Sequence, residues 1–427
     1  MRQLNGQWQK PLGTRGVKAK QMNLDENIIE AINYMGFDQP TEIQEFAIPN
    51  IIAGHDLIAC AQTGTGKTAA FVLPILHQII QTQNQSTSTL IIVPTRELAI
   101  QIDQQIQGFS YFLNIGSIAI YGGGDGIIYA EQERALKNGR DIIIATPGRL
   151  ISHLAQGYVN FKHIKHLVLD EADKMLDMGF LDDIEKIISF LSKERQTLLF
   201  SATMPPKIRS LAKKILRQPK EISLSISKPA EGVNQNVILC YEEQKQPVLL
   251  HILNQYQAYT SIIIFTSQKR KVNEIVQFLR SKKITAAGIS SDLEQNIREE
   301  VIIKFRAKNL RVLVATDVMS RGIDIKNIEM VINYDAPQDA EDYVHRIGRT
   351  ARANSKGDAF TLISPRDMLR IKNIEDLIEM QIPRLPLPEE LGEAPIWKIE
   401  EKQPKKRFYK KSKSKNATHR NSQHNKR

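Results

Sequence analysis

Residues 61–68 read Ala-Gln-Thr-Gly-Thr-Gly-Lys-Thr and directly follow the apolar residues 57–60. An apolar run, a loop with two glycines and the apolar continuation from Ala69 predict a strand, a tight turn and a helix. Gly64 and Gly66 let the backbone turn so that successive N–H groups converge, and the helix N-terminus adds a partial positive charge there. The stretch predicts a phosphate-binding loop, against the simpler interpretation of a glycine-rich turn without a ligand.

Two side chains give this loop its chemistry. The ammonium of Lys67 can reach the outer phosphates of a nucleotide, and the hydroxyl of Thr68 can ligate a magnesium ion that bridges them. Ala61 stands where the strict pattern has its first glycine. The other loop residues expected to contact the nucleotide are Thr63, Gly64, Thr65 and Gly66.

The composition indicates roughly two to three domains without a disulfide framework. The chain has 427 residues, of which 41% are apolar, and two distant cysteines, Cys60 and Cys240, as is typical of a reducing compartment. No apolar run approaches the ~20 residues that cross a bilayer. The polar, basic first 20 residues lack the apolar core of a signal peptide. We therefore expect a cytoplasmic protein that does not contact membranes.

The net charge of +11 is concentrated at one end of the chain. Residues 402–427 hold 11 Lys or Arg and no Asp or Glu, which leaves 47 of the 58 basic residues to face 47 acidic ones elsewhere. This clustering favours a polyanionic partner such as nucleic acid over a tail that only solubilises the chain. Phe408 and Tyr409 can stack on bases there, or they are incidental rings in a disordered segment.

Beyond the loop, apolar runs alternate with segments of helical periodicity in two blocks. The runs lie at 90–93, 117–121, 142–145, 166–169 and 197–200, and in the second block at 236–240, 261–265, 311–315 and 328–332. This alternation predicts parallel sheets with helices on both faces and a ligand site beyond the carboxyl ends of the strands. Residues 223–233, rich in Ser, Pro and Gly, predict a linker. Further helices are expected at 23–35, with Asn23 and Glu26 in capping-box spacing, and at 364–380.

The run at 166–169 ends in Asp170-Glu171-Ala172-Asp173. A carboxylate past a buried strand beside a phosphate loop can hold magnesium through water, and the adjacent glutamate can orient an attacking water. An acidic helix start is the alternative. Together with Lys67, the motif favours nucleotide hydrolysis.

Other strand ends carry arginines, hydroxyls and open backbone N–H groups, which suit a sugar-phosphate backbone, although each motif alone could be a capped loop. These residues are Pro94, Arg96, Gly123, Thr146 and Arg149. The second block has no second Gly-x-x-x-x-Gly-Lys. Instead, Arg346, Arg349 and Arg352 are spaced by three, which predicts one helix face aimed at a nucleotide held by the first block, or a solvated basic face.

In their order and spacing these motifs resemble those of the DEAD-box RNA helicases of superfamily 2, over roughly residues 20–365. The segments that carry the resemblance are 36–44, 61–68, 94–99, 170–173, 201–203 and 345–352. Residues 233–383 look most like the bacterial RhlE-like branch. The departures are Ala19, Ser290-Ser291 and Ala351, at positions where the family usually has an aromatic residue, His-Gly and glycine.

The resemblance implies an α/β fold of two tandem RecA-like parallel-sheet domains with a basic disordered C-terminal tail. The implied divisions are a flexible N-terminus at 1–20, the first domain at 21–222, the linker at 223–233, the second domain at 234–383 and the tail at 384–427.

The resemblance also implies roles for individual residues. ATP would contact Phe37, Gln44 and Asp324 besides the phosphate loop, Asp170 would bind magnesium through water, and Glu171 would be the general base. Lys67, Arg349 and Arg352 would stabilise the transferred phosphoryl group, the arginines as fingers. The coupling residues would be Asp173, Ser201 and Thr203. The RNA contacts would be Pro94, Arg96, Gly123, Thr146 and Arg149 in the first domain and Gln295, Arg298 and Thr316 in the second.

The implied function is ATP-dependent RNA unwinding. RNA-stimulated ATP hydrolysis would close the two domains and open short RNA duplexes locally, or remodel RNA–protein complexes. An ATP-gated RNA clamp without productive unwinding and a DNA-directed motor of the same superfamily are the alternatives. The expected partners are single-stranded RNA and short duplexes, bound through the backbone, and ribosomal or mRNA-processing ribonucleoproteins are compatible with this.

We predict that the basic tail increases RNA affinity electrostatically. Deletion of residues 402–427 should weaken RNA binding and flatten its dependence on salt, because fewer counterions are then released. The measurement is the RNA dissociation constant of the full and shortened chains over a series of salt concentrations. An unchanged salt slope would remove this role.

Overall fold

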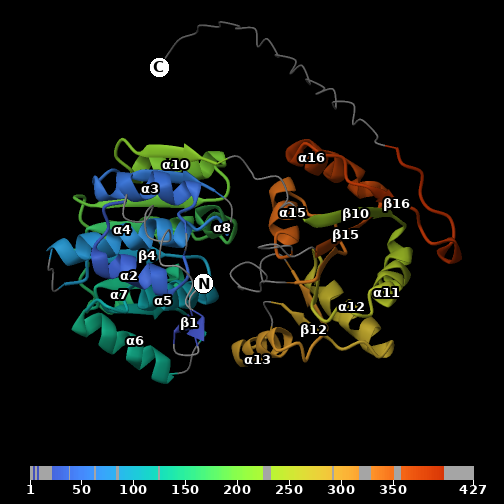
Figure 1. The fold of residues 1–427 in the computed structure, drawn as a ribbon, viewed down its shortest axis with the longest axis horizontal. Helices are drawn as coiled ribbons and strands as arrows, with labels where there is room; N and C mark the ends of the chain where they lie inside the picture. The colour runs from blue at the N-terminus through green and yellow to red at the C-terminus, as the bar shows by residue number, and fades with distance from the viewer. Residues whose placement is uncertain are drawn as a thin grey trace, which may run out of the picture.

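The computed structural model describes residues 22–37, 39–61, 64–82, 86–123, 126–224, 232–290, 293–316, 328–350 and 357–398, and two short strands nearer the N-terminus. These strands, β1 (Gln3–Leu4) and β2 (Gln7–Trp8), pair antiparallel within the segment that we expected to be flexible. The described elements form two α/β domains that lie side by side, the first blue to green and the second yellow to red in Figure 1.

The first domain is built on a parallel seven-stranded sheet in the order β5-β6-β4-β7-β8-β3-β9. Its strands are β3 (Leu57–Cys60), β4 (Thr89–Ile92), β5 (Ser117–Ile120), β6 (Ile142–Ala145), β7 (His166–Leu169), β8 (Gln196–Ser201) and β9 (Lys220–Ser223). The helices are α2 (Glu26–Tyr34), α3 (Glu42–Ile52), α4 (Lys67–Thr82), α5 (Arg96–Phe109), α6 (Gly126–Asn138), α7 (Pro147–Ala155), α8 (Ala172–Asp177), α9 (Leu181–Ser189) and α10 (Pro206–Ile215). Two apolar clusters cover the two faces of this sheet.

The second domain repeats this plan in the order β12-β13-β11-β14-β15-β10-β16. Its strands are β10 (Val233–Leu239), β11 (Ile262–Phe265), β12 (Ala286–Ile289), β13 (Val312–Ala315), β14 (Met330–Asn333), β15 (Gly357–Ile363) and β16 (Arg384–Leu385). The helices are α11 (Lys245–Gln255), α12 (Lys269–Ser281), α13 (Gln295–Arg306), α15 (Ala340–Ile347) and α16 (Met368–Ile378), with 3₁₀ turns η1 (Glu242–Gln244), η2 (Pro365–Asp367) and η3 (Glu389–Leu391).

The predicted runs correspond to strands in both sheets, and the tandem parallel-sheet architecture is confirmed. In the two seven-stranded sheets, the strands β9, β12, β15 and β16 were not anticipated. Residues 384–398, which we assigned to the tail, belong to the second domain, because β16 pairs with β10 and Leu387 lies in the core. The remainder of the basic tail lies outside the described residues.

Two helix ends differ from the sequence expectation. The N-cap of α2 is Asp25, whose carboxylate accepts the N–H of Asn27, and not Asn23, which has a positive φ of 54°. Helix α15 ends at Ile347 with Gly348 as its C-cap, so Arg346 and Arg349 do not share one helix face. Arg346 is instead buried and donates to Asn333 Oδ1 (3.1 Å) and to the carbonyl of Asp335 (2.8 Å), which makes it part of the core of its domain.

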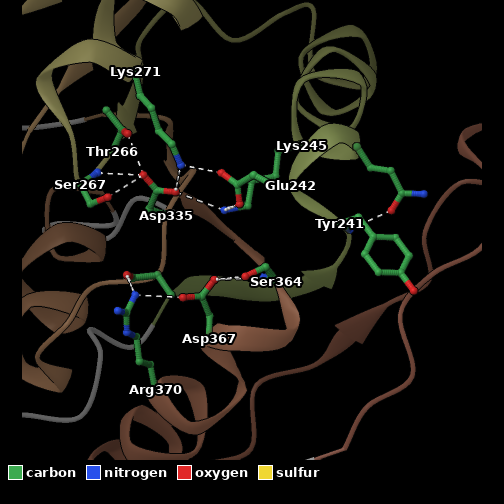
Figure 2. Close-up of polar contacts among 12 residues, drawn as sticks. Tyr241, Glu242, Lys245, Thr266, Ser267, Lys271, Asp335, Ser364, Asp367 and Arg370 are labelled. Carbon is green, nitrogen blue, oxygen red and sulfur yellow. Dashed lines mark hydrogen bonds and ion pairs between the residues drawn. The ribbon is translucent and has the colours of Figure 1, made fainter.

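The carboxyl edge of the second sheet is closed by a charged network around Asp335 (Figure 2). Its carboxylate pairs with Lys245 (3.2 Å) and Lys271 (2.9 Å) and accepts the hydroxyl and the N–H of Ser267. Burial raises the pKa of Asp335, but these two ammonium groups more than offset it, and the pKa lies far below its usual range. Lys245 begins the helix after β10, as Lys67 begins the helix after β3, so the two lysines occupy equivalent positions in the two domains.

None of the helices that the structure describes is long and apolar enough to cross a membrane.

We predict that the Asp335 network stabilises the second domain. Asp335→Ala removes the buried partner of the Lys245 ammonium, which is 1% exposed, and among the described residues leaves it paired only with the exposed carboxylate of Glu242 (3.0 Å). This should cost about 3–5 kcal/mol of unfolding free energy. Urea unfolding followed by the fluorescence of Trp397, which packs on this domain, measures it, with Trp8 changed to Phe in every variant.

The matched control is Glu243→Ala, which removes an exposed carboxylate from the adjacent η1 turn. Its unfolding free energy should stay within ~0.5 kcal/mol of the parent. Equal midpoints for the two variants would contradict a stabilising role for Asp335.

Candidate functional site

The phosphate loop lies between β3 and α4, as predicted. Gly64 and Gly66 have φ of 92° and 89°, values that non-glycine residues rarely adopt, so both glycines are required by the backbone. Lys67 is the first residue of α4, is 7% exposed, and donates from Nζ to the carbonyl of Ala61 (2.8 Å). Thr65 and Thr68 lie on either side of Gly66 and Lys67 and are half-buried, while Thr63 lies outside the described residues.

Gln44 joins this loop to α3. Its Oε1 accepts the N–H of Thr41 (3.0 Å) in a capping box, and its Nε2 donates to the carbonyl of Gly66 (3.0 Å). A Cβ at Gly66 would collide with that Nε2 atom. The amide retains one N–H and an oxygen lone pair, so it can still read an adenine edge. Phe37, the other expected adenine contact, is 37% exposed and packs edge-on against Phe109.

The acidic motif follows β7 at the same edge of the sheet. Asp170 and Glu171 are 3% and 4% exposed, and Glu171 adopts a left-handed backbone conformation with φ of 53°. Asp170 Oδ1 accepts the N–H of Glu171. Glu171 Oε1 forms a buried ion pair with Lys174 Nζ (2.6 Å), while its Oε2 is buried and has no hydrogen-bond partner among the described residues.

The pKa values of Asp170 and Glu171 are shifted in opposite directions. Burial raises the pKa of Asp170 to about 6, although Lys67 lowers it in part. For Glu171, burial also raises the pKa, but the ammonium groups of Lys174 and Lys67 outweigh it and the net pKa is lowered. Glu171 is therefore ionised at neutral pH, as a general base must be.

Asp173 connects the acidic motif to the end of β8. Its Oδ2 accepts the N–H groups of Ala202 (3.1 Å) and Thr203 (2.9 Å) and the hydroxyl of Thr203 (3.1 Å). The hydroxyl of Ser201 accepts the N–H of Asp173 (3.2 Å) and donates to the carbonyl of Thr203 (2.7 Å). The three residues expected to couple the site to domain closure therefore form one hydrogen-bonded unit.

The second domain reaches this site through α15. Burial, together with the nearby charges of Lys174 and Lys67, lowers the pKa of His345 to about 3, so this imidazole is neutral. Arg349 lies in the turn after α15, and its charge also lowers that pKa. Asp324 and Arg352, expected at the nucleotide, lie outside the described residues.

The expected RNA contacts of the first domain gather around the glycine pair at 122–123. Arg96 lies over the ring of Tyr121 (4.5 Å) and donates to the carbonyl of Gly123 (3.4 Å). Arg149 lies over the ring of Tyr129 (5.1 Å). The two other expected contacts are Pro94, between β4 and α5, and Thr146, the N-cap of α7.

In the second domain, Gln295 begins α13, Arg298 lies one turn later, and Thr316 follows β13. Arg298 Nη1 forms an ion pair with Glu97 Oε1 of the first domain (3.3 Å). The expected RNA contacts of the two domains therefore lie next to each other across the domain boundary.

The donor set fits a magnesium ion. Thr68 and Asp170 supply a hydroxyl and a carboxylate, which are the hard oxygen ligands that Mg²⁺ prefers, and the ion usually completes its shell with phosphates and water. Asp170 is buried and has no ion-pair partner of its own among the described residues, so a cation would neutralise its carboxylate. No group of three or more His, Cys, Asp or Glu in the described part of the chain could form a metal site made of protein ligands alone.

Sequence reasoning missed several residues of the site. Lys174 was not identified as a site residue because a lysine in the first turns of a helix is usually exposed to solvent. In this structure it is only 7% exposed. The rings of Tyr121 and Tyr129, which lie under Arg96 and Arg149, were not predicted either. Each tyrosine is distant in sequence from its arginine, and only the fold brings the two together.

Comparison with known proteins agrees with this geometry. Residues 41–211 match the DEAD/DEAH box helicase family, and residues 244–354 match the helicase conserved C-terminal domain. The ATP-dependent RNA helicase CshA of Listeria monocytogenes is 44% identical over 89% of this chain and 71% of its own length. The DEAD-box ATP-dependent RNA helicase CshA of Geobacillus kaustophilus is 40% identical over 86% of this chain and 78% of its own length. S. cerevisiae Dbp5 bound to RNA and ADP BeF3 superposes with a TM-score of 0.77 at 31% identity, over 86% of this chain and 95% of Dbp5.

We predict that Gly66→Ala weakens nucleotide binding beyond its effect on stability. The new Cβ displaces Gln44 Nε2 and strains a backbone at φ of 89°, so ADP affinity should fall roughly tenfold. Gly54→Ala is the matched control, because Gly54 has φ of 82° with no atom within 4 Å of the added Cβ. It should lower thermal stability while ADP affinity, measured by calorimetry, stays unchanged. Equal ADP affinities for the two variants would contradict the prediction.

Proposed function

The chain belongs to the DEAD/DEAH box helicase family, and from this premise we propose how its residues carry out ATP-dependent RNA helicase activity. The protein is an enzyme that hydrolyses ATP and binds RNA. The observation that carries the residue-level proposal is the cluster of buried charges at the carboxyl edge of the first sheet, next to which α15 of the second domain brings His345.

In this proposal the phosphate loop and Lys67 bind the ATP phosphates, and Phe37 and Gln44 hold the adenine. Thr68 and, through water, Asp170 would hold Mg²⁺, which when bound neutralises phosphate charge and positions the β- and γ-phosphates. The Oε2 atom of Glu171, which has no partner among the described residues, is the acceptor for the proton of the attacking water.

The second domain completes the site. Arg349, together with Arg352 and Asp324 beyond the described residues, would contact the nucleotide from across the domain boundary, where guanidinium groups stabilise charge on the transferred phosphoryl group. Asp173 would transmit a movement of the acidic motif to the end of β8 through its hydrogen bonds to the N–H groups of residues 202 and 203.

RNA would lie along the boundary between the domains. Arg96 and Arg149 offer guanidinium groups from the first domain, and Arg298 offers one from the second. In this proposal these groups contact phosphates, and phosphate contacts carry no sequence information, so binding is directed at the backbone. The hydroxyls and backbone groups expected to add to them are those of Pro94, Gly123, Thr146, Gln295 and Thr316.

We further propose that the chain acts on short duplexes or on ribonucleoproteins in the cytoplasm. An ATP-gated clamp without unwinding uses the same residues, and a strand-separation assay distinguishes the two. The resemblance to the RhlE-like branch stays a prediction, since the two bacterial relatives described above carry the name CshA.

We predict that RNA but not DNA stimulates ATP hydrolysis by this chain. Glu171→Gln should lower the RNA-stimulated turnover ~10²–10⁴-fold, because it removes the base, while ATP and RNA still bind. Lys67→Ala should abolish nucleotide binding. Steady-state hydrolysis with no nucleic acid, single-stranded RNA or single-stranded DNA is the measurement.

The matched control for Lys67→Ala is Lys186→Ala, which removes an exposed lysine from α9 and should leave turnover unchanged. Full turnover by the Lys67 variant would refute the assignment of the phosphate loop. Stimulation by DNA equal to that by RNA would favour the DNA-directed alternative.

A further inference from the structure

Two ion pairs connect α5 of the first domain to α13 of the second. Arg96 Nη2 lies 2.6 Å from Glu299 Oε1, and Arg298 Nη1 lies 3.3 Å from Glu97 Oε1. The pairs are reciprocal, since each helix contributes one arginine and the glutamate that follows it. In Figure 1, α13 lies on the side of the second domain that faces the first.

The guanidinium of Arg96 is surrounded by protein groups, most of them from the first domain. One face lies over the ring of Tyr121, Nη1 donates to the carbonyl of Gly123, and Nε is buried without a hydrogen-bond partner among the described residues. The side chain is 15% exposed. Nη2 is therefore the edge that faces the second domain, and a carboxylate oxygen of Glu299 occupies it.

A carboxylate and a phosphate are alternative acceptors for this edge. Both present charged oxygens to a guanidinium in the same planar geometry, and a charge-assisted bond to either is short. Glu299 is 45% exposed, and an ion pair with so exposed a partner contributes little stability. A phosphate that arrives from solvent can therefore displace it.

We propose that Glu299 competes with RNA for Arg96, and that it thereby sets the RNA concentration at which the enzyme engages its substrate. The proposal rests on the role of Arg96 as an RNA phosphate contact. In the RNA-free enzyme, Glu299 neutralises the guanidinium, and an RNA phosphate takes its place on Nη2. The Arg298–Glu97 pair is less exposed, at 15% and 20%, and holds α13 where Glu299 can reach Arg96.

The test is the variant Glu299→Gln. Its side chain keeps the shape of glutamate but loses the charge, so Arg96 is no longer neutralised. The dissociation constant for single-stranded RNA, measured with a non-hydrolysable ATP analogue, should fall roughly two- to tenfold. The RNA concentration for half-maximal ATPase should fall by the same factor, while the maximal rate at saturating RNA stays unchanged.

The chain supplies a matched control in the next residue. Glu300→Gln makes the same change in net charge on the same helix, but the ion pair that Glu300 forms among the described residues is with Lys304 of α13 itself (2.6 Å). It should leave RNA affinity unchanged. Affinity gained equally by both variants would reflect net charge alone and would overturn the proposal, as would weaker RNA binding by Glu299→Gln.

Arg96→Gln separates this inference from the proposed function. It should weaken RNA binding, and in its background Glu299→Gln should have no further effect. If Arg96→Gln leaves RNA affinity unchanged, Arg96 is not an RNA contact and the premise fails. If it weakens binding while Glu299→Gln alone changes nothing, the RNA contact stands and the competition is refuted. Thermal unfolding of each variant confirms that it is folded.

Discussion

Charge buried at the carboxyl edge of the first sheet is the constraint on which the site depends. The cluster consists of Lys67, Asp170, Glu171, Asp173 and Lys174, each no more than 8% exposed. An unpaired charge at such depth costs several kcal/mol, on the order of 3–5, so each member must be compensated. Lys174 compensates Glu171, and the backbone at the end of β8 compensates Asp173. Asp170 is the least compensated of the three carboxylates, and burial, with a smaller contribution from the neighbouring charge of Glu171, raises its pKa.

The second domain also has a buried lysine at the start of a helix, but there a carboxylate of the same domain neutralises its charge. The two sheets have equivalent strand orders, and each has a lysine at the start of the helix after the equivalent strand. Lys245, however, is neutralised by Asp335, which follows β14 as Asp170 follows β7. A lysine committed to a buried carboxylate has no charge to offer a phosphate. In the proposed function, the second domain would therefore contribute to the nucleotide site through the side chains of α15 and the turn after it.

Features that depend on a local sequence pattern, such as apolar strands, could be predicted from the sequence. Features that depend on burial in the folded chain could not. The parallel strands could be placed because runs such as 142–145 are continuously apolar. The strand β12 reads Ala-Ala-Gly-Ile, too weak an apolar signal to stand out without its neighbour β13. The arginines at 346 and 349 look alike in sequence. Only the fold shows that Arg346 is bound by Asn333 in the core, because an arginine carries no sequence signal for burial.

The same argument explains why ligands can control closure of the two domains. The described residues form five apolar clusters, and each lies wholly within one domain. Among the described residues, the ion pairs of Arg96 and Arg298 connect the two domains, and polar interfaces of this kind permit domain motion. Closure therefore gains little from burying apolar surface and depends on charge. In the proposed function, ATP and RNA would both bring phosphates to guanidinium groups on opposite sides of the boundary, so each would favour the closed arrangement that the other also binds. Thermodynamic linkage then requires that each ligand increase the affinity for the other.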